Sequence, residues 1–429
     1  MCPAGMTLID SGAHKLRGRG ALARLRDGDT APMADWLREH LFEQVLPFWE
    51  PLIDQDLGGV FTCVTDRGEI VSREKWLWSQ WRAVWVFSRI YNSLDPSDRW
   101  RDRAEQIARF CVKHGRIEGD VSWALLLDEK GAVKRGGESI YVDAFAVYGL
   151  VELAAATGDR SWLALAVETA DRAIVSIRTL AEKLPHFPYL IWKGGKPHGV
   201  PMIWSIIFAG LAVASGDQKY AEFAIEMTNE VWTDFYDKDT DRVVETVKKS
   251  GGLYPGSPGE VTLPGHVIEG LWFQRLITAQ LGRETHNKEE TWRVMARHFD
   301  LGWEQESGGG LLLAVNQEGQ PVPTEAWPFG ETKLWWPQTE ALFATLLGWH
   351  EMRDSEWLDR YESLWEVCWA HYVDWEHGEW RQKLGRDFSP LTETIALPVK
   401  DPFHLPRSLI MQIELLENKT PPRVATVLK

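Results

Sequence analysis

The chain has 429 residues, of which 44% are hydrophobic and 25% charged, an ordinary globular composition apart from 24 tryptophans. So many aromatic residues exclude a disordered chain. Lys and Arg (47) are outnumbered by Asp and Glu (62), so the net charge of −15 argues against binding to nucleic acid or to anionic membranes. The sequence has no run of eighteen apolar residues, so we expect no transmembrane helix. Its four cysteines lack C-x-x-C spacing. We therefore expect a reduced, cytoplasmic protein without a zinc site.

The first thirty residues carry a cluster of basic side chains and no continuous apolar run, which excludes a secretory signal. The basic residues are Lys15, Arg17, Arg19, Arg24 and Arg26. This composition predicts a flexible basic tail over residues 1–30. No linker-like composition divides the rest, so we expect one domain over residues 31–420.

Helical periodicity dominates from residue 31 onward. It predicts twelve helices, at about 31–50, 75–94, 97–115, 139–157, 159–183, 201–215, 217–234, 265–282, 287–300, 334–352, 354–373 and 405–418. Gly- and Asp-rich pieces between them predict short β-hairpins, at 54–71, 127–137, 237–247, 303–322 and 374–390. Six helix pairs can form an open solenoid or a closed ring. The tryptophans favour closure, because large aromatic side chains can line a central mouth, and we predict an all-α (α/α)6 barrel with short hairpins.

The first candidate motif is KWLWSQWRAVW, at residues 75–85. Trp78, Trp81, Arg82 and Trp85 share one helix face there, and such an aromatic stripe is more often core than site. The informative residue is Arg82, because a guanidinium among indoles either stacks as a structural cation–π pair or donates to a ligand.

The second motif is LPGHVIEGLWF, at residues 263–273. Pro264 predicts a helix start, which places His266 in or next to the first turn. The helix dipole there disfavours imidazolium, and a neutral imidazole can act as a general base. Glu269, three residues on, could orient the ring. The alternative is a capping histidine beside a solvated glutamate.

Two further motifs place polar side chains at helix starts. In ETKLWWPQTEALFA (331–344), Glu340 follows Trp336 by one turn, although a glutamate there also complements the helix dipole. In KDPFHLPRSLIMQIELL (400–416), Pro406 fits a first helical position, so His404 lies just before the helix and can reach into a cavity. Arg407 opposes the dipole of its first turn, which marks either a functional residue or a pair with a neighbouring acid.

A weaker motif is SIYVDAFAVYGL, at residues 139–150, where Asp143 interrupts an apolar run. Its carboxylate could bind a substrate hydroxyl or only cap its helix. Alternate helices of a closed barrel run the same way, so the polar residues at their starts should meet at one mouth. Histidine, arginine and glutamate side chains brought together there suit a polar, neutral ligand with an acidic C–H bond.

Together these motifs resemble the N-acylglucosamine 2-epimerase family, which includes cellobiose 2-epimerases and aldose–ketose isomerases. The resemblance covers most of residues 31–418 and rests on W-x-Q-x-R-x-x-W, S-x-Y-x-D-A-F, P-G-H-x-x-E, W-W-P-x-T-E-A and F-H-x-P-R. It implies an (α/α)6 barrel that needs no metal, and we expect no cofactor. It also implies that His266 and His404 are the catalytic bases, that Arg82 holds the C1 and C2 oxygens of the sugar, and that Glu340 supports the site. We add Glu269 to the catalytic set and expect substrate contacts from Trp78, Gln80, Asp143, Tyr141, Trp336, Lys333 and Arg407.

The chain departs from this pattern in two places. Cellobiose 2-epimerases and mannose isomerases carry an extra histidine on the helix that matches residues 200–210, whereas this chain reads VPMIWSIIFAG there and resembles the acylglucosamine branch. His198, just upstream, is not expected to replace that histidine. Near Trp380 the chain reads WRQKL where family members often show W-F-G-Y-L.

We therefore predict a sugar 2-epimerase that inverts C2 of an acylhexosamine or related aldose. One histidine removes the C2 proton, an enediolate forms, and the other returns a proton to the opposite face. The nearest alternative is an aldose–ketose isomerase on mannose-like sugars. Others are a glycoside hydrolase, with carboxylates among Glu269, Glu340 and Asp143, and a non-catalytic sugar-binding barrel. The expected partner is a small sugar, and a homodimer with a second copy of the chain is left open.

Overall fold

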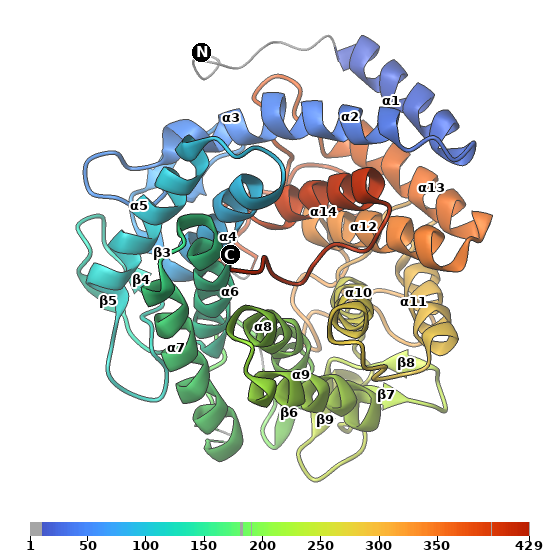
Figure 1. Cartoon of the computed structure of the whole chain (residues 1–429). Helices are drawn as coiled ribbons and strands as arrows, with labels where there is room; N and C mark the ends of the chain where they lie inside the picture. The colour runs from blue at the N-terminus through green and yellow to red at the C-terminus, as the bar shows by residue number, and fades with distance from the viewer. Residues whose placement is uncertain (1–10, 181–182, 190, 396, 429) are drawn as a thin grey trace.

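The computed structural model describes residues 11–180, 183–189, 191–395 and 397–428 (Figure 1). Each of the twelve helices expected from the sequence has a counterpart in it. They are α2 (Ala31–His40), α4 (Leu77–Ser93), α5 (Asp98–Gly115), α6 (Ile140–Thr157), α7 (Arg160–Thr179), α8 (Gly199–Ser215), α9 (Gln218–Glu230), α10 (Pro264–Leu281), α11 (Lys288–Gly302), α12 (Trp335–Met352), α13 (Ser355–His371) and α14 (His404–Asn418). After α2 the chain passes through a π-helical turn, Leu41–Val45, into the short helix α3 (Leu46–Trp49).

Six of these helices form a closed inner ring. In order around the ring they are α4, α6, α8, α10, α12 and α14; each contacts the next, and α14 contacts α4. The outer helices α5, α7, α9, α11 and α13 each pack on the inner helix that precedes them, and α2 packs on α14. The first pair is therefore made by the two ends of the chain (Figure 1). The predicted (α/α)6 barrel is confirmed.

The two rings differ in composition because they differ in burial. Inner helices such as α6 and α8 are apolar on all sides, and nearly all of their residues are buried. The outer helix α5 buries one apolar face and exposes charged residues on the other. Helix α6 is long and apolar enough to cross a membrane, but 89% of it is buried inside the protein. Its apolar character is that of an inner helix of the ring.

Most of the tryptophans support the packing of the helices. Trp81, Trp85 and Trp272 are fully buried in the main core, whereas the tryptophans among the described residues that line the central cavity are Trp78, Trp335 and Trp336. Indole rings are large enough to fill the space between two helical layers. The expectation that the tryptophan excess lines a mouth is therefore correct for those three residues only.

Short strands connect the helices at one end of the barrel, and three of the expected hairpins form. They are β1 (Cys63–Val64) with β2 (Ile70–Ser72), β4 (Leu126–Leu127) with β5 (Val133–Arg135), to which β3 (Lys75–Trp76) adds, and β7 (Tyr236–Asp237) with β8 (Arg242–Val243). Residues 303–322 make only isolated bridges. Within 374–390, Leu384 makes an isolated bridge to Pro390, while β11 (Lys383–Leu384) forms its ladder with β10 (Lys333–Leu334). An unexpected pair joins β6 (Gly195–Pro197) to β9 (Thr246–Lys248).

The expected flexible tail is wrong for residues 11–26, which form the helix α1 (Ser11–Arg26). Leu25 is fully buried against the barrel, and Arg19 pairs with Glu366 at 2.7 Å. The indole of Trp36 also donates to the carbonyl of His14 at 2.9 Å. Basic side chains that suggested a solvated tail thus bind acidic residues far along the chain. Residues 1–10 of the expected tail lie outside the described residues.

The C-terminal segment crosses the end of the barrel where the inner helices finish (Figure 1). Thr426 donates its backbone N–H and its hydroxyl to the two carboxylate oxygens of Glu152, at 2.9 and 2.8 Å. Glu152 also pairs with Arg89 at 2.9 Å, and Arg89 pairs with Glu414 at 2.6 Å. This buried network closes the barrel at that end and leaves the opposite end for a site.

Candidate active site

A cavity opens where the inner helices begin, and every inner helix contributes to its wall. The contributing residues include Arg82 of α4, Tyr141 of α6, Met202 of α8, His266 of α10, Trp336 of α12 and His404 of α14. The expected meeting of alternate helix starts at one mouth is therefore confirmed. Helix N-termini carry partial positive charge, which stabilises anionic groups placed among them.

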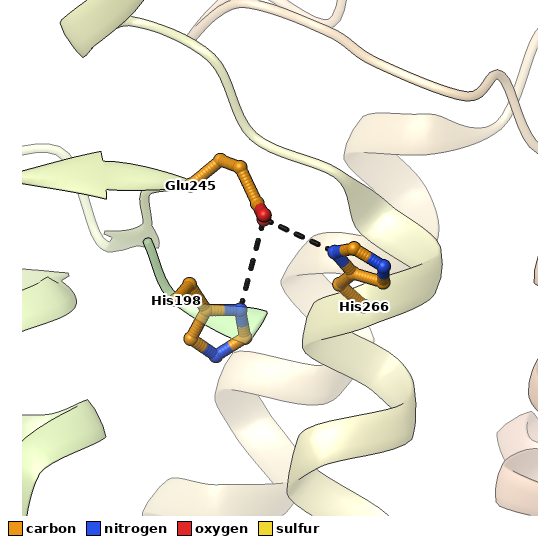
Figure 2. A group of neighbouring side chains, drawn as sticks. All are labelled: His198, Glu245 and His266. Carbon is orange, nitrogen blue, oxygen red and sulfur yellow. Dashed lines mark hydrogen bonds and ion pairs between the residues drawn. The ribbon is translucent and has the colours of Figure 1, made fainter. Parts of the chain in front are cut away.

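His266 is held from behind by a carboxylate that the sequence did not suggest. Its Nδ1 lies 3.2 Å from Oε2 of Glu245, and the Nδ1 of His198 lies 3.8 Å from the same oxygen on the other side (Figure 2). The β6–β9 pair sets this arrangement, because His198 follows β6 and donates its backbone N–H to the carbonyl of Glu245, just before β9. Glu269 makes no contact of this kind with the ring; its carboxylate pairs with Arg407.

The buried carboxylate of Glu245 shifts the pKa of His266 in the direction opposite to that expected from the helix dipole. Burial lowers the pKa of His266, but the negative charge of Glu245 and its hydrogen bond outweigh that effect, so the pKa is raised. Burial raises the pKa of Glu245, yet the two neighbouring imidazoles bring it down to about 2. The helix dipole was expected to favour the neutral ring, whereas the shift in the pKa of His266 is upward. The pairing with Glu245 favours the imidazolium.

His404 is the first residue of α14 and has its own carboxylate partner. Its Nδ1 lies 2.7 Å from Oε1 of Glu340, whose other oxygen accepts the indole N–H of Trp272 at 3.1 Å. Arg407 pairs with both Glu340, at 2.7 Å, and Glu269. Burial, followed by the positive charge of Arg82, lowers the pKa of His404 to about 3. His404 is therefore neutral where His266 is favoured as a cation.

Arg82 stacks on aromatic rings, which is one of the two roles that its motif left open. Its guanidinium lies over the ring of Phe145 at 4.0 Å and that of Trp78 at 4.7 Å, and it also lines the cavity. One terminal nitrogen, Nη1, donates to Oδ2 of Asp401 at 2.6 Å. Its Nε has no hydrogen-bond partner within the described part of the chain. A buried donor without a partner is available to an oxygen of a ligand.

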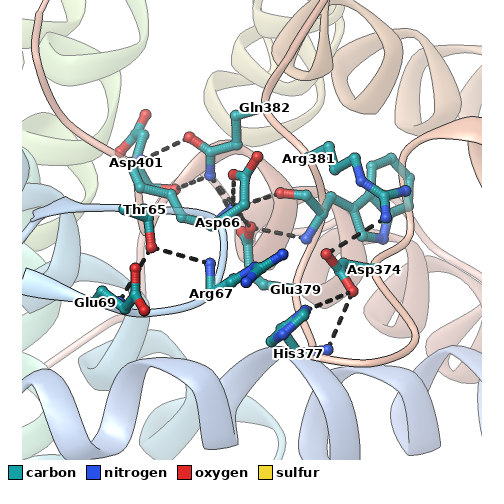
Figure 3. A network of polar contacts seen from close by, with 12 residues as sticks. Thr65, Asp66, Arg67, Glu69, Asp374, His377, Glu379, Arg381, Gln382 and Asp401 are labelled. Atoms are coloured by element: carbon teal, nitrogen blue, oxygen red, sulfur yellow. Dashed lines mark hydrogen bonds and ion pairs between the residues drawn. The ribbon is translucent and has the colours of Figure 1, made fainter. Parts of the chain in front are cut away.

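A polar network fixes the segment that carries Asp401 (Figure 3). Gln382 accepts the backbone N–H of Asp401 at 2.7 Å and donates to its carbonyl at 3.0 Å. Glu379, fully buried with φ at +63°, accepts from Gln382 at 3.2 Å and pairs with Lys400 at 2.9 Å. Lys400 also pairs with Asp66 at 2.8 Å. The hairpin near Trp380 therefore supports the site from behind.

Three residues expected to contact substrate are turned elsewhere. Gln80 exchanges two hydrogen bonds with the backbone of Val60, at 2.7 and 2.8 Å. Asp143 accepts the backbone N–H of Ser122 at 2.8 Å, a loop residue outside its own helix, so it does not cap that helix as the alternative expected. Lys333 donates to the hydroxyl of Ser307 at 3.0 Å. None of the three lines the cavity, because each forms its hydrogen bonds with a loop that lies behind an inner helix.

The other expected residues lie at the cavity or directly behind it. His266, His404, Arg82, Glu269, Trp78, Tyr141 and Trp336 line the cavity wall. Glu340 and Arg407 are buried behind the wall, where they hold His404 and Glu269. The resemblance implied that Glu340 supports the site, and its carboxylate contacts His404 and Arg407.

The comparisons with known proteins agree with this geometry. A family model described as N-acylglucosamine 2-epimerase (GlcNAc 2-epimerase) matches residues 59–406. The chain belongs to this family. The N-acylglucosamine 2-epimerase of Rattus norvegicus is 27% identical over 380 residues, covering 87% of this chain and 90% of the relative. The cellobiose 2-epimerase of Ruminococcus albus is 24% identical over 401 residues, covering 87% and 96%. The crystal structure of a sugar epimerase from a ruminal bacterium matches with a TM-score of 0.77 at 20% identity, covering 91% of this chain and 100% of the other.

The N-acylglucosamine 2-epimerase family consists of carbohydrate epimerases and isomerases, and this chain is one of its members. The resemblance stated from five short motifs is thus confirmed. Sequence reasoning missed Glu245 and Asp401 as parts of the site. Glu245 could have been suspected, because VVETV is a strand-like apolar run with one charged residue inside it. Asp401 stands in the quoted motif, but its partner Arg82 lies 319 residues away.

Two groups of side chains in this family member could also hold a divalent cation. They are His198, Glu245 and His266, and Glu269, Glu340 and His404; within each group the donor atoms lie within 4.8 Å of one another. In the second group Arg407 already supplies the positive charge. In both groups the same atoms fix the orientation of a histidine that lines the cavity.

Proposed function

We infer that this protein is a sugar 2-epimerase that inverts C2 of an N-acylhexosamine through an enediolate. The observation that carries this proposal is a pair of matched histidines on one cavity. His266 and His404 each present Nδ1 to a buried carboxylate, Glu245 at 3.2 Å and Glu340 at 2.7 Å. A histidine anchored through Nδ1 keeps Nε2 for proton transfer. Epimerisation needs two such groups, one for each face of C2.

The opposite pKa shifts assign different starting roles to the two histidines. His404, with its pKa lowered to about 3, begins neutral and accepts the C2 proton. His266, with its pKa raised by Glu245, begins as the imidazolium and donates a proton to the opposite face. After one turnover the protonation states are exchanged, and the same pair then serves the reverse reaction.

The rings of both histidines contact one tryptophan. Trp336 lies 5.0 Å from the ring centre of His266 and 5.8 Å from that of His404. A ring-opened sugar at this tryptophan would lie within reach of both imidazoles. Indole faces pack well on the C–H groups of sugars. An isomerase needs only one base that moves the proton from C2 to C1, so the second anchored histidine favours the epimerase.

Arg82 is placed to stabilise the charge that develops on the sugar. Loss of the C2 proton puts negative charge on the C1 oxygen, and a fixed, buried donor stabilises such an oxyanion strongly. Arg82 lines the cavity, and its buried Nε–H, which has no partner among the described residues, is such a donor. The aromatic rings of Phe145 and Trp78 hold the guanidinium in place.

An apolar part of the cavity supports an N-acyl substituent on the substrate. Met202 and Ile203 on α8 line the wall where other branches were expected to carry a histidine, and Leu397 and Val399 line it from the loop that precedes α14. A methyl group of an acyl chain would be buried favourably there. The rat relative, named an N-acylglucosamine 2-epimerase, supports the same substrate class.

The proposal is tested by incubating the protein with candidate sugars in D₂O and following C2 by NMR. N-acetylglucosamine, N-acetylmannosamine, mannose and cellobiose form the panel. We expect deuterium at C2 and interconversion of the two acylhexosamines, and no labelling by the His404→Ala variant. A ketose product would establish the isomerase instead. Release of monosaccharide from cellobiose, without labelling, would establish a hydrolase.

A further inference from the structure

One carboxylate at the reacting end of the cavity is left without a role in this chemistry. Asp401 is 4% exposed, and its Oδ2 lies between Arg82, at 2.6 Å, and Nε2 of His404, at 3.8 Å. Its second oxygen, Oδ1, has no hydrogen-bond partner among the described residues, although Asp401 lines the cavity. A buried carboxylate oxygen without a donor is costly unless a ligand supplies one.

We propose that Asp401 is a specificity-determining residue, whose free Oδ1 accepts a hydrogen bond from the neutral reacting end of the sugar and whose charge rejects carboxylate-ended sugars. The donor is a hydroxyl or amide N–H at or next to C2. This inference rests on the proposed function, because it places the reacting carbons beside Arg82 and His404.

The position of Asp401 is fixed too firmly for it to move aside. Gln382 holds both its backbone N–H and its carbonyl, and Gln382 is in turn held by the buried Glu379 (Figure 3). The preceding residue, Lys400, is buried and donates to the carbonyl of Trp380 at 2.6 Å. A salt bridge to Arg82 alone would not need so many hydrogen bonds around Asp401. These hydrogen bonds keep Oδ1 of Asp401, a residue of the cavity wall, in a constant position.

The charges around Asp401 explain how it would select. Arg82 is the cation nearest to it, and their pairing neutralises the guanidinium that would otherwise attract anions. The next cation, Arg407, is already shared by Glu269 and Glu340. The amine of Lys383, at the cavity rim, donates to a backbone carbonyl. The imidazolium of His266, also on the cavity wall, is paired with Glu245 at 3.2 Å. A carboxylate at C1 of a ligand would therefore meet the Asp401 charge without an unpaired cation to compensate.

The test compares two acyclic ligands that differ only at C1. D-Mannitol ends in a hydroxymethyl group and D-mannonate in a carboxylate, and calorimetry gives the Kd of each without any turnover. In the Asp401→Asn variant, which removes the charge and keeps the shape, we expect mannonate to bind about tenfold more tightly and mannitol about tenfold more weakly. The opposite signs are the signature, because simple damage to the site would weaken both.

Controls separate this result from other causes. Asp374→Asn makes the same chemical change in a buried aspartate of the neighbouring hairpin, outside the cavity, and should leave both Kd values unchanged. If Asp401→Asn does not fold, Asp401→Ser should give the same two signs. Changes of the same sign for both ligands, or no change, would overturn the proposal. Because C2 labelling by the unmodified protein is measured separately, failure of the proposed function would be seen independently.

Discussion

Replacing Glu245 by glutamine should move the pH dependence of the reaction without removing either histidine. The glutamine keeps the size of the side chain and an oxygen that can accept from Nδ1 of His266. It removes the negative charge that lies 3.2 Å from that nitrogen. The perturbation therefore acts on the pKa of His266, which is raised by Glu245, and leaves the geometry of the cavity wall in place.

The expected size follows from the burial of the pair. An opposite charge within about 4–6 Å shifts a pKa by about one to three units, and each unit corresponds to about 1.36 kcal/mol. Without the charge of Glu245, burial is opposed only by the smaller effect of the Glu269 charge, so the pKa of His266 falls. A step that needs the imidazolium is lost as the pH rises through this pKa. In Glu245→Gln that loss should occur about one to three pH units lower.

The assay is kcat/KM for the conversion of N-acetylmannosamine to N-acetylglucosamine, measured between pH 5 and pH 9 in the unmodified protein and in the variant. His198→Gln is the companion variant, because His198 contacts the same oxygen at the longer distance of 3.8 Å and should give a smaller shift. If Glu245→Gln is folded and active but the alkaline limb of its kcat/KM profile is unchanged, the charge of Glu245 is not what raises the pKa of His266.

Three further predictions concern stability and can be checked by thermal and urea unfolding. Leu25→Ala should destabilise the protein by about 2–4 kcal/mol, because Leu25 is fully buried, while Leu16→Ala, 71% exposed on the same helix, should change little; equal effects would mean that α1 is not docked. Gln80→Met should lower the free energy of unfolding by about 2–4 kcal/mol and leave KM unchanged within twofold, because Gln80 bonds only to backbone groups of Val60. A large rise in KM would mean that Gln80 contacts the substrate after all. Glu152→Gln should lower the free energy of unfolding by about 3 kcal/mol, because Arg89 loses one of its counter-charges. An unchanged unfolding midpoint would contradict the role of the buried Glu152–Arg89 network in closing the barrel.

The helices could be predicted well because the signal is local. An outer helix such as α5 repeats its apolar residues every three to four positions, and inner helices such as α6 are bounded by turn residues, so twelve segments were placed from the sequence. Helix α1 was missed because its sequence, with two glycines among basic residues, has no apolar face of its own. Its attachment depends on acids such as Glu366 that are about 350 residues away.

The candidate site was predicted where its residues begin helices. His266 and His404 follow from proline-marked helix starts, and a closed barrel brings those starts together. The partners that set their charge were not predictable in this way. Glu245 reaches His266 through the β6–β9 pairing of segments about fifty residues apart, which a short strand sequence does not specify. Gln80 was misassigned for the opposite reason, because a polar residue beside Arg82 can serve the loop at Val60 as well as a ligand.

The most direct test of the two-histidine account is the isotope content of product and substrate in the first turnovers in D₂O. Removal of the C2 proton by one imidazole and delivery by the other, from opposite faces, predicts that newly formed epimer carries solvent deuterium at C2 while recovered substrate stays unlabelled. His266→Ala and His404→Ala should each abolish the labelled product. Product that retains the original C2 proton, or full activity in either variant, would contradict the account.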